Sequence, residues 1–181
     1  MKEMSQSEKN YFFGITGIQE YNYFIKAGEY YCGDTKKKVT TILGSCVSVV
    51  FYNQKINCMA IYHGVMPVYN GEKNDFYYVD RAIIALIDKM KRNGIEKKDI
   101  KVMIIGGGDV LKNDKNIPHI SIGEKNVQSA VNTLKKEGLK IYRKITGGSC
   151  GRKVIFYPNP GKIIVKNLPS EYNIQYSDIF N

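Results

Sequence analysis

Two residues able to perform nucleophilic chemistry lie in the stretch TTILGSCVSVVFYNQKINCMAIYHGVMP, residues 40–67. Cys46 is one of four cysteines in the chain, and His63 is one of two histidines. A cysteine beside an imidazole loses its proton more readily, and the resulting thiolate is a strong nucleophile. The residue types therefore indicate cysteine-dependent acyl chemistry, provided that the fold brings the two side chains together.

A β-hairpin is the element expected to position this pair. Two β-prone runs, CVSVVFY and CMAIYH, are separated by the polar segment NQKIN. A two-residue turn at Gln54-Lys55, or a four-residue turn over 53–56, places Cys46 directly opposite His63. Their Cβ atoms would then lie roughly 5 Å apart on one face of the hairpin. A three-residue turn would shift the register by one residue and separate them.

Residues close to Cys46 are candidates for the remaining parts of a catalytic site. Gly44 permits a sharp turn before the strand, and the backbone N–H groups of Ser45 and Cys46 could then form an oxyanion hole. Thr40 lies six residues before Cys46 and faces the same side in an extended chain. Its hydroxyl or carbonyl group could accept the N–H of His63. Gly44 and Ser45 are thus predicted to be oxyanion or substrate residues.

Other interpretations of these residues stay open. One cysteine and one histidine on adjacent strands often only fill a core, because cysteine is among the most buried residue types. A metal site built from Cys46, Cys58, His63 and Cys150 is less favoured, because the chain has no CxxC or HxxxH pair. Cys58 is also expected to point to the face opposite His63.

The glycine-rich run IIGGGDVL, residues 104–111, follows a strand-like segment. It lacks the lysine spacing of a phosphate-binding loop and the second half of a dinucleotide fingerprint. We therefore expect these glycines to serve tight packing, and we expect neither a cofactor nor a metal.

Composition favours a globular cytoplasmic protein. The chain has 181 residues, of which 43% are hydrophobic, and no apolar run is long enough to span a bilayer. The N-terminus has no signal-peptide pattern, and the cysteines show no paired spacing, so reduced thiols are expected. The net charge of +10 comes from scattered lysines without a nucleic-acid motif. This pattern favours a solvated basic surface and no nucleic-acid partner. The lack of a long apolar run predicts no membrane insertion, and nothing in the sequence requires more than a monomer.

The chain reads as a single domain over residues 1–181. We expect a polar tail over 1–10, a core over 11–167 and a C-terminal extension over 168–181. No internal repeat or interdomain linker interrupts the core.

The elements of this core follow from hydrophobic periodicity. Helical spacing runs from residue 79 to about 93 and from about 123 to 137, and glycine follows each segment. Strand-like runs occur before residue 43, in the hairpin, over 100–105 and in three segments between 139 and 167. Two helices among many strands predict an α/β or α+β fold, a mixed β-sandwich covered by helices.

An ordered series of motifs resembles the CheD family of chemoreceptor glutamine deamidases. The resemblance covers roughly residues 24–167, and its most specific part runs from the GSC motif to His63. No single motif is specific for the family, but the order of the motifs is. The motifs are LGSCVSVVFYN, AIYHGVMP, YYVDRAIIALIDKM, IIGGGDVL, IGEKNV and TGGSCGRKVIFYPNPGKIIVK.

The resemblance implies a fold similar to the catalytic domain of deamidating bacterial toxins. It also implies a Cys–His–Thr triad, which falls on Cys46, His63 and Thr40, with Thr41 adjacent. The implied enzyme is a cysteine-dependent protein-glutamine glutaminase, which converts glutamines of methyl-accepting chemotaxis proteins to glutamate through a thioester and releases ammonia. The family resemblance also implies binding to the phosphatase CheC. The alternative function is therefore a regulatory module that acts mainly by binding CheC in chemotaxis adaptation.

Overall fold

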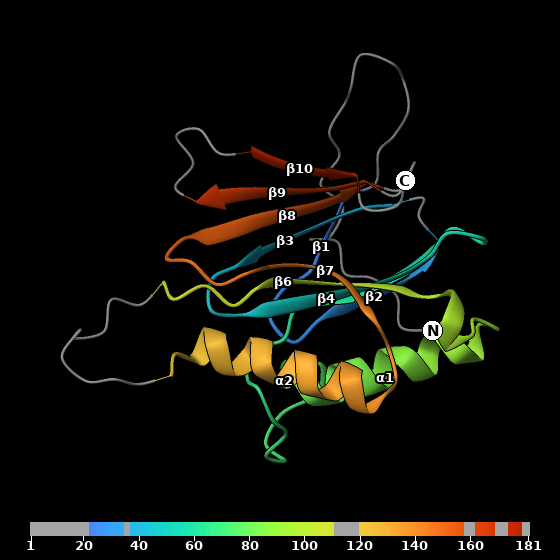
Figure 1. Cartoon of the computed structure of the whole chain (residues 1–181), viewed down its shortest axis with the longest axis horizontal. Helices are drawn as coiled ribbons and strands as arrows, with labels where there is room; N and C mark the ends of the chain where they lie inside the picture. The colour runs from blue at the N-terminus through green and yellow to red at the C-terminus, as the bar shows by residue number, and fades with distance from the viewer. Residues whose placement is uncertain (1–21, 35–36, 111–119, 158–161, 169–173, 179–181) are drawn as a thin grey trace, which may run out of the picture.

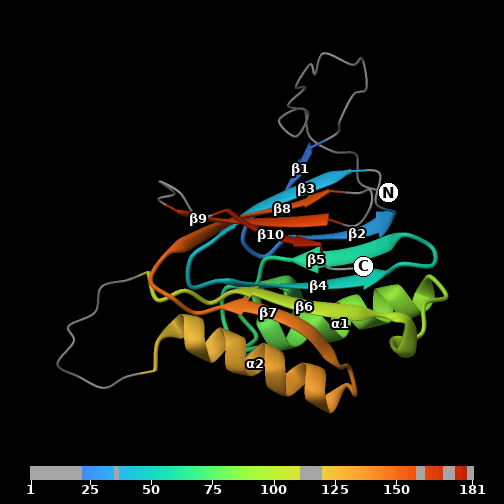
Figure 2. The same cartoon turned by 45° about the horizontal axis from the view of Figure 1, so that its top comes forward.

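The computed structural model describes residues 22–34, 37–110, 120–157, 162–168 and 174–178. In this part of the chain, two five-stranded β-sheets and a pair of α-helices form three layers (Figures 1 and 2). The predicted α+β class is confirmed. In chain order the elements are β1 (Asn22–Phe24), β2 (Tyr30–Asp34), β3 (Lys38–Leu43), β4 (Val47–Asn53), β5 (Cys58–Tyr62), η2 (Asp75–Tyr77), α1 (Val79–Arg92), η3 (Lys97–Asp99), β6 (Lys101–Gly106), α2 (Ile122–Lys136), β7 (Ile141–Thr146), β8 (Gly151–Tyr157), β9 (Lys162–Leu168) and β10 (Ile174–Asp178).

Both sheets mix parallel and antiparallel pairing. Sheet A has the strand order β1-β3-β8-β9-β10, and sheet B has the order β2-β5-β4-β6-β7. The β1–β3 and β6–β7 pairs are parallel, and the other pairs are antiparallel. Because β3 belongs to sheet A and β4 to sheet B, the short link between them crosses from one layer to the next.

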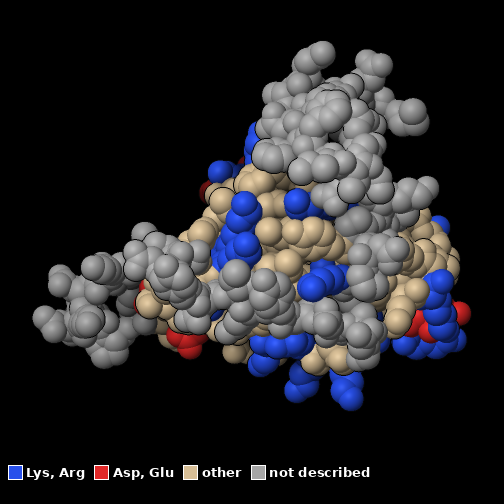
Figure 3. Space-filling view, turned by 90° about the horizontal axis from the view of Figure 1, so that it is seen from above, with Lys and Arg blue, Asp and Glu red and all other residues tan. Residues whose placement is uncertain are grey.

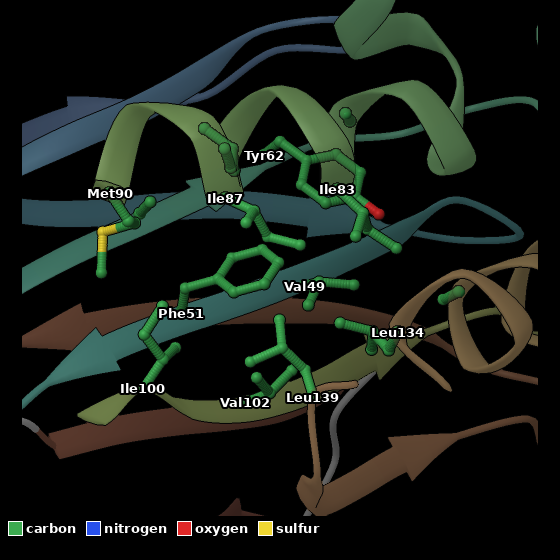
Figure 4. Packing of buried hydrophobic residues seen from close by; sticks show 14 of the residues in the cluster. Val49, Phe51, Tyr62, Ile83, Ile87, Met90, Ile100, Val102, Leu134 and Leu139 are labelled. Atoms are coloured by element: carbon green, nitrogen blue, oxygen red, sulfur yellow. The ribbon is translucent and has the colours of Figure 1, made fainter. Parts of the chain in front are cut away.

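Both helices cover the face of sheet B that points away from sheet A (Figure 1). Their apolar residues recur at helical spacing, so each helix presents one apolar stripe to the sheet. In Figure 4, Phe51 of β4 lies among Ile83 and Ile87 of α1, with Leu134 of α2 close by. The two predicted helices are confirmed, and Gly94, with a φ of 76°, follows the end of α1.

A second core lies between the two sheets. Strand β4 is buried along its whole length and contributes to both cores, because its side chains alternate between the two faces. Val49 and Phe51 face the helices, whereas Val50 and Tyr52 face sheet A. Even-numbered residues at the start of β4 therefore point into the space between the sheets.

The β4–β5 hairpin has a different register from the predicted one. Its turn covers residues 54–57, and Asn53 pairs with Cys58. Asn57 closes the turn in the left-handed region at a φ of 51°, which asparagine tolerates better than most residues. Its side-chain oxygen accepts a hydrogen bond from the hydroxyl of Tyr52 at 2.8 Å.

This register makes the predicted direct opposition of Cys46 and His63 wrong. Val47 bridges Gly64, so His63 falls two positions away from the residue opposite Cys46. A shift of two positions preserves the face of each side chain, whereas a shift of one reverses it. Cys46 and His63 are therefore diagonal neighbours on the face of sheet B that points towards sheet A.

The C-terminal extension that the sequence predicts is described only in part. The extension predicted over 168–181 contains β10, which pairs antiparallel with β9 and forms an edge of sheet A. The predicted polar tail over 1–10 and the turn at 159–161 lie outside the described residues. Within the described ranges, no helix is both long and apolar enough to cross a membrane.

Candidate active site

The nucleophile candidate lies in the link Gly44–Cys46, where the chain crosses between the sheets. All three carbonyl groups of this link accept hydrogen bonds. The carbonyl of Gly44 accepts from the N–H of Gly108 at 2.8 Å, and that of Cys46 accepts from the N–H of Gly107 at 2.8 Å. The carbonyl of Ser45 accepts from the side-chain nitrogen of Asn126 at 3.0 Å.

These bonds determine the direction of the intervening N–H groups. In a trans peptide the C=O and N–H groups point to opposite sides. The N–H groups of Ser45 and Cys46 therefore point away from the partners that hold the carbonyls of Gly44 and Ser45. Within the described part of the chain, neither N–H group donates to a carbonyl or side-chain oxygen. Two directed donors of this kind can stabilise an oxyanion.

The glycines that follow β6 permit the close approach of backbone to this link. A Cβ atom on Gly106, which has a φ of 110°, would lie 2.3 Å from the carbonyl oxygen of Cys46. One on Gly107, at a φ of 63°, would lie 2.8 Å from the carbonyl oxygen of Gly123 in α2. The expectation that the glycine-rich run serves tight packing is confirmed.

His63 follows β5, and two hydrogen bonds hold its backbone in place. Its N–H donates to the carbonyl of Glu29 at 3.0 Å, and its carbonyl accepts from the N–H of Gly28 at 2.8 Å. The side chain is 8% exposed, and its Nδ1 lies 2.9 Å from the hydroxyl oxygen of Thr41 in sheet A.

The hydroxyl of Thr41 determines the tautomer of this imidazole. It donates its one proton to the carbonyl oxygen of Ile25 at 2.8 Å. Its oxygen must therefore accept from Nδ1–H of His63, which leaves Nε2 as the unprotonated nitrogen. An imidazole oriented in this way can act as a general base through Nε2.

Thr41, and not the predicted Thr40, contacts His63. Buried residues alternate along β3, so Thr41 points between the sheets, whereas Thr40 points to the outer face of sheet A. The prediction assumed an extended chain from Thr40 to Cys46. The chain instead bends at Gly44 and Ser45 as it changes sheets, so the alternation of faces does not continue across the link.

Burial favours the neutral forms of both candidate residues. It raises the pKa of the Cys46 thiol, and the N–H of the same residue partly offsets this effect. Burial also lowers the pKa of His63, against smaller opposing effects of the Ile25 carbonyl and the charge of Glu29. Both effects favour the uncharged pair, a thiol and a neutral imidazole, over a thiolate and an imidazolium.

Two of the other three cysteines, Cys32 and Cys58, belong to the helix-facing core, and the third, Cys150, lies near the glycines that follow β6. Cys58 packs in the helix-facing core, on the face opposite His63 as expected. The carbonyl oxygen of Cys150 lies near Gly108, at 2.9 Å from the position of an added Cβ atom. Among the described residues, no three His, Cys, Asp or Glu side chains gather in a way that could hold a metal ion.

Comparison with known proteins identifies the family. The family model described as CheD chemotactic sensory transduction matches residues 66–167, which is more than half of the chain. A protein of Geobacter sulfurreducens named "Probable chemoreceptor glutamine deamidase CheD 2" is 35% identical over 146 residues, covering 80% of this chain and 89% of the relative. The chain belongs to the CheD family. The resemblance inferred from the ordered motifs is thereby confirmed.

Further CheD relatives come from two other organisms. Proteins named "Probable chemoreceptor glutamine deamidase CheD" are 31% identical in Methanococcus maripaludis (78% of this chain and 92% of the relative) and 30% identical in Rhodospirillum rubrum (86% and 88%). Among solved structures, the hypothetical protein YfiH of Bacillus licheniformis matches with a TM-score of 0.40 and 15% identity, covering 65% of this chain and 49% of that one. This last likeness is too weak to support an argument.

Two polar residues beside the candidate site were not predicted. Asn126 on α2 is fully buried, and Arg152 on β8 is 7% exposed. Arg152 donates to the carbonyls of Gly106 at 3.4 Å and Gly147. Gly106 begins the segment Gly106–Gly108, the glycine turn. A signal for Asn126 was present, because it falls four residues before Ala130 on the apolar stripe of α2.

Proposed function

We propose that this chain is a chemoreceptor glutamine deamidase in which Cys46 is the nucleophile and His63 the general base. The observation that carries the proposal is the chain of hydrogen bonds from His63 through Thr41 to Ile25. It leaves Nε2 unprotonated on the same face as a half-buried cysteine. The names of the CheD relatives supply the substrate, a glutamine side chain of a chemoreceptor.

The first half of the reaction forms a thioester. Nε2 of His63 takes the proton of the Cys46 thiol as sulfur attacks the carboxamide carbon of the glutamine. The N–H groups of Ser45 and Cys46 stabilise the negative oxygen of the tetrahedral intermediate. The imidazolium then gives its proton to the nitrogen, the C–N bond breaks, and ammonia leaves.

The second half consumes water. His63, neutral again, takes a proton from a water molecule that attacks the thioester carbon. The C–S bond breaks, the product is a glutamate side chain, and the proton returns from His63 to the sulfur of Cys46. Throughout both halves Thr41 accepts the Nδ1–H, which keeps Nε2 available. No cofactor is required for the balance of atoms or electrons.

The basic surface suits an acidic receptor helix. The chain carries a net charge of +10. Lys153, Lys162 and Lys166 lie on the face of sheet A that points away from sheet B, because their neighbours along β8 and β9 pack inward. Figure 3 looks onto this face, where Lys and Arg side chains are spread and Asp and Glu lie at the rim. Opposite charge of this kind accelerates encounter with a glutamate-rich partner in the cytoplasm.

The test uses the purified cytoplasmic fragment of a chemoreceptor from the same organism. Peptide mass spectrometry measures glutamine-to-glutamate conversion by the wild type, by Cys46→Ala and by Cys58→Ala, a control of the same residue type on the opposite face. We expect conversion by the wild type and Cys58→Ala alone. Free glutamine should not be a substrate. Conversion by Cys46→Ala, or none by the folded wild type on several receptors, would contradict the proposal.

The regulatory alternative is separable with the same variants. Binding of CheC does not require a thiol nucleophile, so a module of that kind would bind CheC equally well as wild type and as Cys46→Ala. Size-exclusion chromatography with and without CheC measures this binding, and the chain alone reports on the predicted monomer.

A further inference from the structure

Asn126 is an unusual residue for the inner face of an amphipathic helix. Its side chain is fully buried at the start of α2. Its nitrogen donates to two carbonyl oxygens, that of Ser45 at 3.0 Å and that of Val65 at 2.9 Å. Carbonyl oxygens only accept, so the nitrogen, and not the oxygen, of the amide must face them.

These two bonds connect the two halves of the proposed site. Ser45 immediately precedes the nucleophile, and Val65 comes two residues after His63. The ladder between β4 and β5 ends near the bridge from Val47 to Gly64. Beyond that point, one amide nitrogen of Asn126 holds the segment of Cys46 and the segment of His63 at a fixed separation.

The bond to Ser45 has a direct consequence for the oxyanion donors. The carbonyl of Ser45 and the N–H of Cys46 belong to one planar trans peptide, so fixing the carbonyl fixes the direction of the N–H. The backbone N–H of Gly108 fixes the preceding peptide in the same manner. Of the two proposed donors, only the Cys46 N–H therefore depends on a side chain for its orientation.

Packing alone does not account for asparagine at this position. Its side-chain oxygen is buried and has no hydrogen-bond partner among the described residues, which costs free energy that an apolar residue would avoid. Helix α2 already contacts the glycine turn through backbone, since a Cβ atom on Gly123 would lie 2.7 Å from the carbonyl carbon of Gly107. This contact of α2 with the glycine turn does not involve the Asn126 amide.

We infer that Asn126 is a positioning residue for the oxyanion hole, which orients the N–H of Cys46 through the carbonyl of Ser45. The inference rests on the proposed deamidase function. The hydrogen bonds of the Asn126 side chain go to backbone carbonyls, so its loss should weaken stabilisation of the tetrahedral intermediate without changing the thiol itself.

The test compares two reactions of Cys46 in the variant Asn126→Ala. Deamidation of the receptor fragment forms an oxyanion, whereas alkylation by iodoacetamide is a displacement that forms none. We expect the kcat of deamidation to fall roughly 10- to 100-fold, somewhat less than for outright removal of an oxyanion donor. KM and the alkylation rate of Cys46, read on the tryptic peptide, should each change less than about threefold. Asn132→Ala, an exposed asparagine of the same helix, is the matched control and should keep the wild-type kcat.

Asn126→Ser is a second variant that tests the inference if Asn126→Ala does not fold. Its smaller hydroxyl leaves a polar space next to two carbonyls, which a water molecule can fill and bridge. We expect its kcat to lie between those of wild type and Asn126→Ala. An unchanged kcat in Asn126→Ala, equal losses of deamidation and alkylation, or a chain in which neither variant folds would overturn the inference. If wild type itself fails to deamidate, the proposed function is wrong, a result that the wild-type measurement identifies by itself.

Discussion

Replacing Thr41 by valine removes one hydroxyl group and almost no volume. Thr41 is 1% exposed, so the substitution leaves its two partners, Nδ1–H of His63 and the carbonyl of Ile25, buried without their hydrogen bonds. Thr40 offers a matched control, because it is the same residue type on the same strand but points to the outer face of sheet A.

The expected loss follows from the charge that His63 acquires during the reaction. In the transition state the imidazole becomes imidazolium, and a hydrogen bond to a charged group contributes about 1.5–3 kcal/mol. At about 1.4 kcal/mol per factor of ten, kcat/KM of Thr41→Val should fall roughly 10- to 150-fold. The free energy of unfolding should also fall by about 1–3 kcal/mol, because two buried polar groups lose their partner. Thr40→Val should stay within about threefold of wild-type activity.

The assay is the initial rate of glutamine-to-glutamate conversion on the receptor fragment, measured by peptide mass spectrometry below KM. Urea unfolding of each variant, followed by circular dichroism, ensures that rates are compared between folded proteins. Wild-type activity in Thr41→Val together with a large loss in Thr40→Val would refute the assignment. It would restore the threonine expected from the sequence alone.

Three further outcomes follow from the same geometry. Because burial lowers the pKa of His63, the native state binds a proton at this residue less readily than the unfolded chain does. In a pH–rate profile, kcat/KM should therefore stay at its plateau as pH falls to about 6.5 and then decline around the lowered pKa, and an acid limb centred above 6.5 would contradict this. The stability that this group contributes is present above about pH 6.5 and is lost as pH falls towards the pKa of the folded state. Gly138 has a φ of 71°, and a Cβ added there would have nothing within 4 Å, so Gly138→Ala should lower the free energy of unfolding in urea by about 1–2 kcal/mol. A Cβ added at Gly107 would lie 2.3 Å from Val127 and 2.8 Å from the backbone of Gly123. Gly107→Ala should therefore lower the free energy of unfolding further and also lower deamidation. Raising the salt concentration from about 0.05 to 0.5 M should lower kcat/KM on the receptor fragment but not on a short neutral glutamine peptide, and equal effects on both would exclude charge steering.

The helices and most strands could be predicted from the sequence because their signals are local. Apolar spacing from Val79 onwards, and the glycines after each helix, depend on neighbouring residues only. The register of the β4–β5 hairpin was mispredicted because it depends on the backbone conformation of Asn57, which a run of polar turn residues does not specify. The predicted face of each side chain was nevertheless correct, because the register shifted by two residues.

The site was predicted less completely because its parts come from different layers. Sequence spacing relates residues along one strand, but between Thr41 and Cys46 the chain leaves sheet A and enters sheet B. Asn126 approaches from a third layer, 61 positions after Val65 in the chain. The polar residue on an apolar stripe was visible, whereas its two carbonyl partners followed only from the packing of α2 against the glycine turn.

The separation of these parts has a mechanistic consequence. The proposed base is attached to sheet B, the threonine that orients it belongs to sheet A, and the nucleophile lies on the link between them. The relative position of the two sheets, held by the inter-sheet core of Val50, Met103 and Phe156 among others, therefore determines whether Thr41 reaches His63. A cavity in this core can change the distance between the sheets, whereas one in the helix-facing core around Phe51 leaves that distance alone. Activity should thus be more sensitive to packing between the sheets than to equally destabilising changes beneath the helices.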